Sequence, residues 1–179
     1  MKSNYIGKEF KLKNFKINDN NSKAYKEIEN IIKNRDTIYI PLCLFGSNGV
    51  GKTHLLKAVI SSKSYSKSLY TTIYDFSNSY IDSVKNQTMC SFNEGYLKLD
   101  ILLIDDFEFI VNREETQKEI YQIFKHLIDL NKVIIIVSSF EYSKLSLIPK
   151  LYSLLEHGNI INIKENSDCV ALLMSSNKT

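Results

Sequence analysis

The chain has 179 residues, which fits one domain with a short extension, and its 44% hydrophobic content is ordinary for a globular core. The net charge of +3 is too small to indicate a nucleic-acid-binding protein, and the basic N-terminal residues fit a solvated segment as well as a DNA contact. The three cysteines have neither CxxC nor Cys/His ligand spacing, which argues against a disulfide framework and a zinc site. Without a membrane-length apolar run or a signal-peptide pattern, we expect a cytoplasmic protein.

Apolar, β-prone runs alternate with helical patterns along the chain. We expect strands at residues 38–45, 69–74, 101–105, 133–138 and 160–163. We expect helices at residues 22–33, 52–61, 77–85, 114–130 and 144–155. This alternation predicts an α/β fold with a parallel sheet between helices.

The clearest helical pattern is that of residues 114–130. Its apolar positions follow helical spacing and are Ile120, Ile123, Phe124, Leu127 and Leu130. Asn112, with Glu115 three residues later, predicts a capping box at the start of this helix.

Residues 46–53 read GSNGVGKT and match G-x-x-x-x-G-K-[ST], the phosphate-binding loop (P-loop) of nucleoside triphosphate proteins. Glycines permit the backbone angles that turn the N–H groups toward phosphate oxygens, Lys52 reaches the β- and γ-phosphates, and the Thr53 hydroxyl is a Mg²⁺ ligand. We expect packing rather than catalysis from His54. The candidate nucleotide-binding residues are Gly46, Ser47, Asn48, Gly49, Val50, Gly51, Lys52, Thr53 and His54.

Two carboxylates, Asp105 and Asp106, end the apolar run that begins at residue 101. An acid at a strand end beside a P-loop holds Mg²⁺, which predicts this role for Asp105. Asp106 and Lys52 are the candidate catalytic residues. Asp106 is expected to orient or deprotonate the attacking water. Ser138 and Ser139 end the next strand, where they either approach the γ-phosphate or form an ordinary turn.

Four strings in the chain resemble the AAA+ domain of the bacterial replication initiator DnaA. Residues 39–46, 51–55, 102–109 and 137–139 are similar to that family's YNPLFIYG, GKTHL, LLIDDIQF and ISS. The resemblance extends over nearly the whole chain and implies a P-loop NTPase of AAA+ type that binds ATP and Mg²⁺ on a five-stranded parallel sheet. It also implies that Phe10, Asn14 and Phe15 lie near the adenine.

The resemblance divides the chain into three parts. Residues 1–36 are expected to form an N-terminal segment and first helix, residues 37–164 the nucleotide-binding core, and residues 165–179 a residual lid helix and tail. The family's lid would be absent or reduced to one helix, at about residues 167–175, and its duplex-DNA-binding domain would be missing. The start at Met1 and the polar tail favour a natural short protein over a piece of a longer one.

Three positions depart from the family pattern. Phe140 replaces the aspartate that follows the two serines, which removes a sensor carboxylate. Leu154 stands at the arginine-finger position, and Lys150 stands at an upstream arginine position. We therefore expect ATP hydrolysis to be weak or to depend on a partner.

The segment 76–99 is long enough for two short helices. In the resembled family this insertion touches single-stranded DNA, and the candidate contacts are Ile81, Lys85, Lys98 and, further on, Arg113. The alternative is a surface helical pair with ordinary solvated lysines.

The leading hypothesis is an ATP-binding, DnaA-like AAA+ protein that acts in DNA replication initiation or its regulation, with a replication initiator or helicase as partner. One alternative is a non-hydrolysing adaptor that binds an initiator or helicase. Another is a small helicase loader or mobile-element ATPase, and a metabolite kinase is a more distant one. The hypothesis also allows for a homo- or hetero-oligomer.

Overall fold

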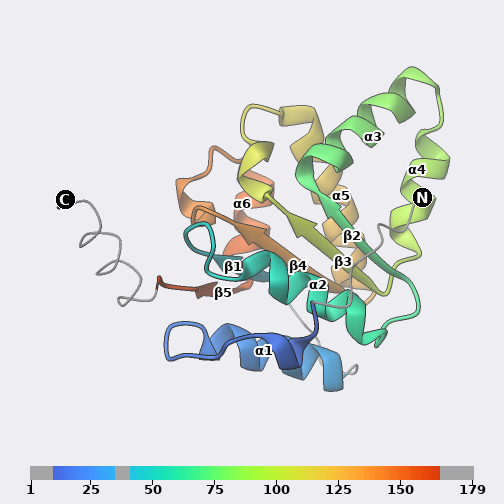
Figure 1. Cartoon of the computed structure of the whole chain (residues 1–179). Helices are drawn as coiled ribbons and strands as arrows, with labels where there is room; N and C mark the ends of the chain where they lie inside the picture. The colour runs from blue at the N-terminus through green and yellow to red at the C-terminus, as the bar shows by residue number, and fades with distance from the viewer. Residues whose placement is uncertain (1–9, 35–40, 166–179) are drawn as a thin grey trace, which may run out of the picture.

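A computed structural model describes residues 10–34 and 41–165. In this part of the chain, parallel strands form one five-stranded sheet in the order β2-β3-β4-β1-β5. The strands are β1 (Leu42–Phe45), β2 (Ser68–Thr72), β3 (Ile101–Asp105), β4 (Val133–Ser138) and β5 (Asn159–Asn162). The parallel α/β sheet predicted from the alternating pattern is confirmed, and Figure 1 shows it crossing the centre of the molecule.

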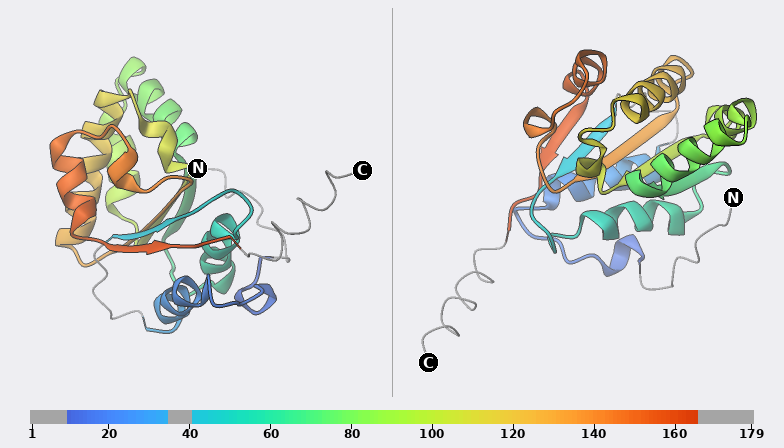
Figure 2. Two further views of the ribbon diagram at one scale, coloured as in Figure 1. Left: turned by 90° about the vertical axis from the view of Figure 1, so that its left-hand side faces the viewer. Right: turned by 90° about the horizontal axis from the view of Figure 1, so that it is seen from above.

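Helices cover both faces of the sheet. On one face lie α1 (Ser22–Lys33) and α2 (Lys52–Ser62), and on the other lie α3 (Ile73–Lys85), α4 (Met89–Leu97), α5 (Glu114–Asp129) and α6 (Pro149–Glu156). Figure 2 shows the three layers, with the sheet between the two groups of helices.

Alternate residues of the strands feed two separate hydrophobic clusters. Leu42 and Leu44 of β1 pack with α1 and α2, whereas Cys43 points to the cluster beneath α3, α5 and α6. The strands are buried on both faces, which is why each reads as an almost continuous apolar run. Burial also raises the pKa of the Cys43 thiol to about 12, so this cysteine serves as core packing.

Strand β2 ends at Thr72, two residues before the predicted end, and α3 begins at once. The reason is a cap: the Asp75 N–H donates to Thr72 Oγ1 at 3.0 Å, and the Thr72 hydroxyl donates to Asp75 Oδ2 at 2.9 Å. The segment 76–99 then contains the two expected helices, the end of α3 and all of α4.

The predicted helix at 144–155 is wrong at its start. Residues Tyr142–Lys144 form a short 3-10 segment, η3, and α6 begins only at Pro149. Proline disfavours helical angles in the residue before it, and Ile148 is extended at φ −62° and ψ 146°.

The predicted capping box of α5 is also wrong. The N-cap is Arg113, which makes no side-chain capping hydrogen bond, and Asn112 has a left-handed φ of 62°. Four of the five predicted apolar positions are buried, but Leu130 follows the helix end and is 49% exposed.

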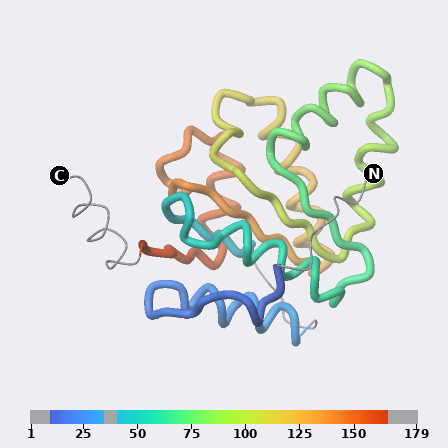
Figure 3. Tube along the Cα trace, in the orientation of Figure 1, coloured from blue at the N-terminus to red at the C-terminus, as the bar shows by residue number. Residues whose placement is uncertain are grey.

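Two further 3-10 segments, η1 (Leu12–Asn14) and η2 (Phe107–Ile110), complete the described elements. The P-loop, η2 and the segment after β4 follow the carboxyl ends of neighbouring strands, so they gather at one edge of the sheet (Figure 3). Within the described residues, no helix combines the length and apolar character needed to cross a bilayer. The lid helix expected at residues 167–175 lies outside the described residues.

Candidate nucleotide-binding site

The P-loop connects β1 directly to α2, and glycines are required at its tightest points. Gly51 is the N-cap of α2 and has a φ of 99°, and a Cβ there would come within 2.6 Å of the Phe15 ring. A Cβ on Gly46 would collide with the carbonyl oxygen of Ile163. The predicted strand–loop–helix arrangement is present. The first N–H groups of a helix have no partner within the helix and are available to phosphate oxygens.

Lys52 is the first residue of α2 and is only 8% exposed. Its Nζ donates to the Gly46 carbonyl at 2.6 Å and to the Ser47 carbonyl at 2.8 Å. Burial lowers the pKa of Lys52, and the negative charges of Glu108, Asp105 and Asp106 oppose that shift. The ammonium group is therefore a cation held at the loop, with three carboxylates acting on it.

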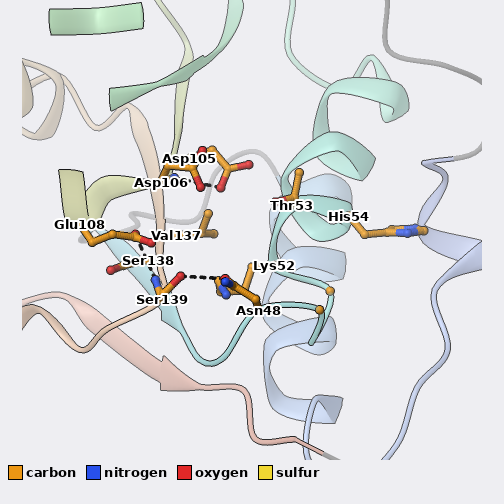
Figure 4. A pocket seen from close by; sticks show the side chains of 12 residues that line it. Asn48, Lys52, Thr53, His54, Asp105, Asp106, Glu108, Val137, Ser138 and Ser139 are labelled. Carbon is orange, nitrogen blue, oxygen red and sulfur yellow. Dashed lines mark hydrogen bonds between the residues drawn. The ribbon is translucent and has the colours of Figure 1, made fainter. Parts of the chain in front are cut away.

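A cavity of about 180 Å³ lies between the P-loop and the ends of β3 and β4. Figure 4 shows Lys52 and Thr53 on the α2 side and Asp105, Asp106 and Glu108 on the side of the strands. The cavity lining also contains Asn48, Gly49, Gly51, His54, Val137, Ser138 and Ser139. Six of the nine predicted nucleotide-binding residues thus meet in one cavity, and both predicted acids join them.

Asp105 is 3% exposed and is oriented by two hydrogen bonds. The Tyr70 hydroxyl donates to its Oδ2 at 2.8 Å, and the Asp106 backbone N–H donates to its Oδ1 at 3.0 Å. Burial and the Asp105 charge raise the pKa of Tyr70, so its phenol stays a donor. The sequence analysis missed Tyr70, because only the pairing of β2 with β3 brings it to Asp105.

Asp106 follows β3 with a left-handed φ of 56°, which turns its carboxyl away from the strand and toward the cavity. Partial burial raises the pKa of this carboxyl, and the charges of Asp105 and Glu108 raise it further, whereas Lys52 opposes the shift. A carboxylate with a raised pKa is a better proton acceptor than Glu108, whose pKa is lowered.

Glu108 is a third carboxylate in the cavity, and the sequence analysis did not single it out. Its Oε2 accepts from the Ser139 backbone N–H at 3.1 Å, and the Ser139 hydroxyl donates to Asn48 Oδ1 at 3.0 Å (Figure 4). Burial raises the pKa of Glu108, but hydrogen bonds from Ser139 and Ser138 outweigh it, and the net pKa is lowered. The contacts tie η2, the end of β4 and the P-loop together.

The N-terminal segment packs against the start of α2. His54 stacks edge-on with the rings of Phe10 and Phe15, each with a centroid distance of 5.4 Å, and its Nε2 lies 3.1 Å from the Lys11 carbonyl. The Lys57 ammonium lies 4.7 Å from the Phe10 ring centroid. The aromatic segment therefore borders the cavity at His54, as expected for packing.

The four candidate single-stranded DNA contacts lie on or beside three different helices. Ile81 and Lys85 are exposed on α3. Lys98 directly follows the C-terminal end of α4 and forms an ion pair with Glu94 at 2.9 Å. Arg113 lies 5.9 Å from the Tyr74 ring centroid at the start of α5. These positions leave the DNA contacts a proposal for an assembled state.

The residues at 140, 150 and 154, which depart from the family pattern, do not line the cavity. Phe140 is 56% exposed beyond β4, and Leu154 packs on α6 against the larger hydrophobic cluster. Within residues 10–34 and 41–165 the only arginine is Arg113, and its guanidinium lies over the Tyr74 ring. Within this part of the chain, no arginine lines the cavity.

The residues present fit a nucleoside triphosphate with Mg²⁺. The glycine cradle, Lys52 and the positive end of α2 suit phosphates, and Thr53 and Asp105 suit a hydrated Mg²⁺ shared with phosphate oxygens. No group of three or more His, Cys, Asp or Glu residues in the described ranges forms a metal site by itself. Mg²⁺ at such sites is normally shared with the phosphates and does not require a cluster of protein ligands.

The family model of the bacterial DnaA ATPase domain matches residues 6–162. The chromosomal replication initiator protein DnaA of Sulfurimonas denitrificans is 35% identical over 154 residues, which are 84% of this chain and 35% of that protein. That of Aquifex aeolicus is 32% identical over 163 residues, which are 89% of this chain and 41% of that protein. The chain thus spans well under half the length of these curated relatives.

Solved structures agree with the sequence comparisons. A replication initiator DnaA bound to AMPPCP and single-stranded DNA matches with a TM-score of 0.86 at 31% identity, over 91% of this chain and 52% of that chain. Domain III of the Thermotoga maritima DnaA matches with a TM-score of 0.85 at 30% identity, over 95% of this chain and 73% of that chain. The DnaC helicase loader, at 20% identity and a TM-score of 0.70, shares the fold alone. The expected AAA+ type of α/β fold is confirmed, and the chain belongs to the bacterial DnaA ATPase domain family.

Proposed function

We propose that this chain binds ATP with Mg²⁺ and acts in the cytoplasm in the initiation of DNA replication or its regulation. The observation that carries the proposal is the cavity in which the buried Lys52 faces Asp105 across a glycine cradle. Residues 46–53 would hold the phosphates, and Thr53 and Asp105 would hold Mg²⁺, which neutralises phosphate charge when bound. Tyr70 keeps the Asp105 carboxylate facing the cavity.

Hydrolysis by the isolated chain is proposed to be weak. Asp106 is placed to orient or deprotonate a water, but no guanidinium reaches the cavity from the described residues. An arginine finger contributes roughly 10³–10⁵ in rate, so its loss leaves slow turnover. A partner that places a cation beside the cavity, at the carboxyl ends of the strands, would restore the rate.

The proposed partner is a replication initiator or helicase. The relatives named above are replication initiators, and one related structure carries AMPPCP and single-stranded DNA. A direct role for Ile81, Lys85, Lys98 and Arg113 in DNA binding requires assembly, because they lie on separate parts of this chain. Such binding should weaken steeply with salt.

A phosphate-release assay distinguishes a weak ATPase from a non-hydrolysing adaptor. We expect slow release by the chain alone, release with a DnaA initiator that exceeds the initiator's own rate, and loss of both contributions of the chain in Asp106→Ala. The second candidate, a non-hydrolysing adaptor, is favoured by Phe140 and Leu154 and predicts no release above a control without the chain, with or without the initiator. Partner-stimulated release that Asp106→Ala leaves unchanged would show that the activity belongs to the initiator alone.

A further inference from the structure

Glu108 places a negative charge on the wall of the cavity that faces Lys52. It stands on η2, one turn beyond β3, and lines the cavity on the side opposite α2 (Figure 4). A P-loop lysine holds the β- and γ-phosphates, so a γ-phosphate on Lys52 projects away from α2 toward this wall. Among the carboxylates that act on Lys52, Glu108 has the largest influence.

The Glu108 carboxylate is held in place by its surroundings. Its Oε2 accepts from the Ser139 N–H at 3.1 Å, and Ser139 in turn donates from its hydroxyl to Asn48 Oδ1 at 3.0 Å. These contacts fix the carboxylate against the end of β4 and keep it ionised at neutral pH. In this structure the charge therefore has a defined position at the cavity wall.

A neutral side chain of the same length as Glu108 isolates the effect of its charge, and glutamine is that side chain. Glutamine has the same shape and can accept the same hydrogen bond from Ser139. The difference between the two side chains is one negative charge.

We propose that Glu108 is a specificity-determining residue that disfavours the γ-phosphate, so that the site prefers ADP over ATP more strongly than it would with a neutral side chain. This inference rests on the proposed function, since it assumes that a nucleotide occupies the cavity. The ATP-bound state would then be scarce until a partner offsets the charge. Glu108 would in this way regulate which nucleotide the chain holds.

The test is a calorimetric titration of wild type, Glu108→Gln and Glu108→Ala with ATP and with ADP, each with Mg²⁺. Glu108→Gln should tighten ATP about tenfold, the effect expected for one unit charge at several ångströms in an intermediate dielectric, and should leave ADP within about twofold. Glu108→Ala also removes the charge, so it should shift the ratio of ATP to ADP affinity in the same direction. Glu141→Gln removes a carboxylate beyond β4 that does not line the cavity, and should leave the ratio unchanged.

An unchanged ratio in Glu108→Gln, or an equal change for both nucleotides, would overturn the inference while leaving nucleotide binding intact. A shift in Glu108→Ala alone would assign Glu108 a purely structural role through Ser139, and would also overturn it. If wild type binds neither nucleotide, the proposed function fails together with this inference.

Discussion

Tyr70→Phe tests whether Asp105 is held for its task by the neighbouring strand. The substitution removes one hydroxyl, which donates to Asp105 Oδ2 at 2.8 Å, and leaves the ring in place. A hydrogen bond to a charged group contributes about 1.5–3 kcal/mol, and Asp105 is only 3% exposed, so water cannot readily replace the lost donor. We expect the free energy of unfolding to fall by about 2 kcal/mol, which corresponds to about 4–8 °C in Tm for a chain of this size.

The assay is urea unfolding of wild type, Tyr70→Phe, Asp105→Asn and the double variant. The cycle should give a coupling energy of about 1.5–3 kcal/mol between the two side chains. Tyr74→Phe is the matched control, because Tyr74 is 58% exposed and should tolerate the change within about 0.5 kcal/mol. A Tyr70→Phe variant as stable as wild type, with no coupling to position 105, would refute this account of how Asp105 is oriented.

Three further predictions concern other parts of the molecule. Gln117→Leu should lower the free energy of unfolding by about 2–4 kcal/mol in urea melts, because the buried amide bonds the Ile110 and Ser146 carbonyls and the Ile148 N–H, and a loss under about 1 kcal/mol would contradict this. Asp106→Asn should raise Tm at pH 7, because it removes a charge that the folded protein disfavours. The pKa of Asp106 is raised in the folded protein, so the wild type has its full stability at this position below about pH 3.8, where the carboxyl is protonated, and loses it as pH rises through the folded pKa. The gain should therefore disappear near pH 3.8 in thermal melts, and a gain independent of pH would count against the raised pKa. Gly51→Ala, at φ 99° and against Phe15, should abolish calorimetric ATP binding in a folded protein; binding at wild-type affinity would show that the cradle tolerates a Cβ.

Much of the fold was readable because its signals are local. The P-loop string, the apolar runs ending in Asp105 and Ser138, and the α5 pattern each depend on neighbours in sequence. The misplaced boundaries have local causes that were overlooked: Thr72 and Asp75 cap α3, and Pro149 starts α6. The predicted capping box failed because Asn112 adopts a left-handed conformation instead.

The parts of the site that were missed depend on strand order and on side chains that meet across it. Tyr70 reaches Asp105 only because β2 pairs with β3 in a register that the sequence does not specify. Glu108 and Ser139 are 31 positions apart in the sequence, and they meet because β3 and β4 are neighbouring strands. Glu108 could not be recognised as a site residue until the cavity showed which side chains surround Lys52.

The central claim is that the cavity beside Lys52 is a working nucleotide site. The most direct test is calorimetric titration of wild type, Lys52→Ala and the exposed control Lys144→Ala with ATP and ADP in the presence of Mg²⁺. The account predicts saturable binding in wild type and Lys144→Ala and its loss in Lys52→Ala, with all three proteins folded. Equal binding by Lys52→Ala, or no binding by wild type, would contradict it.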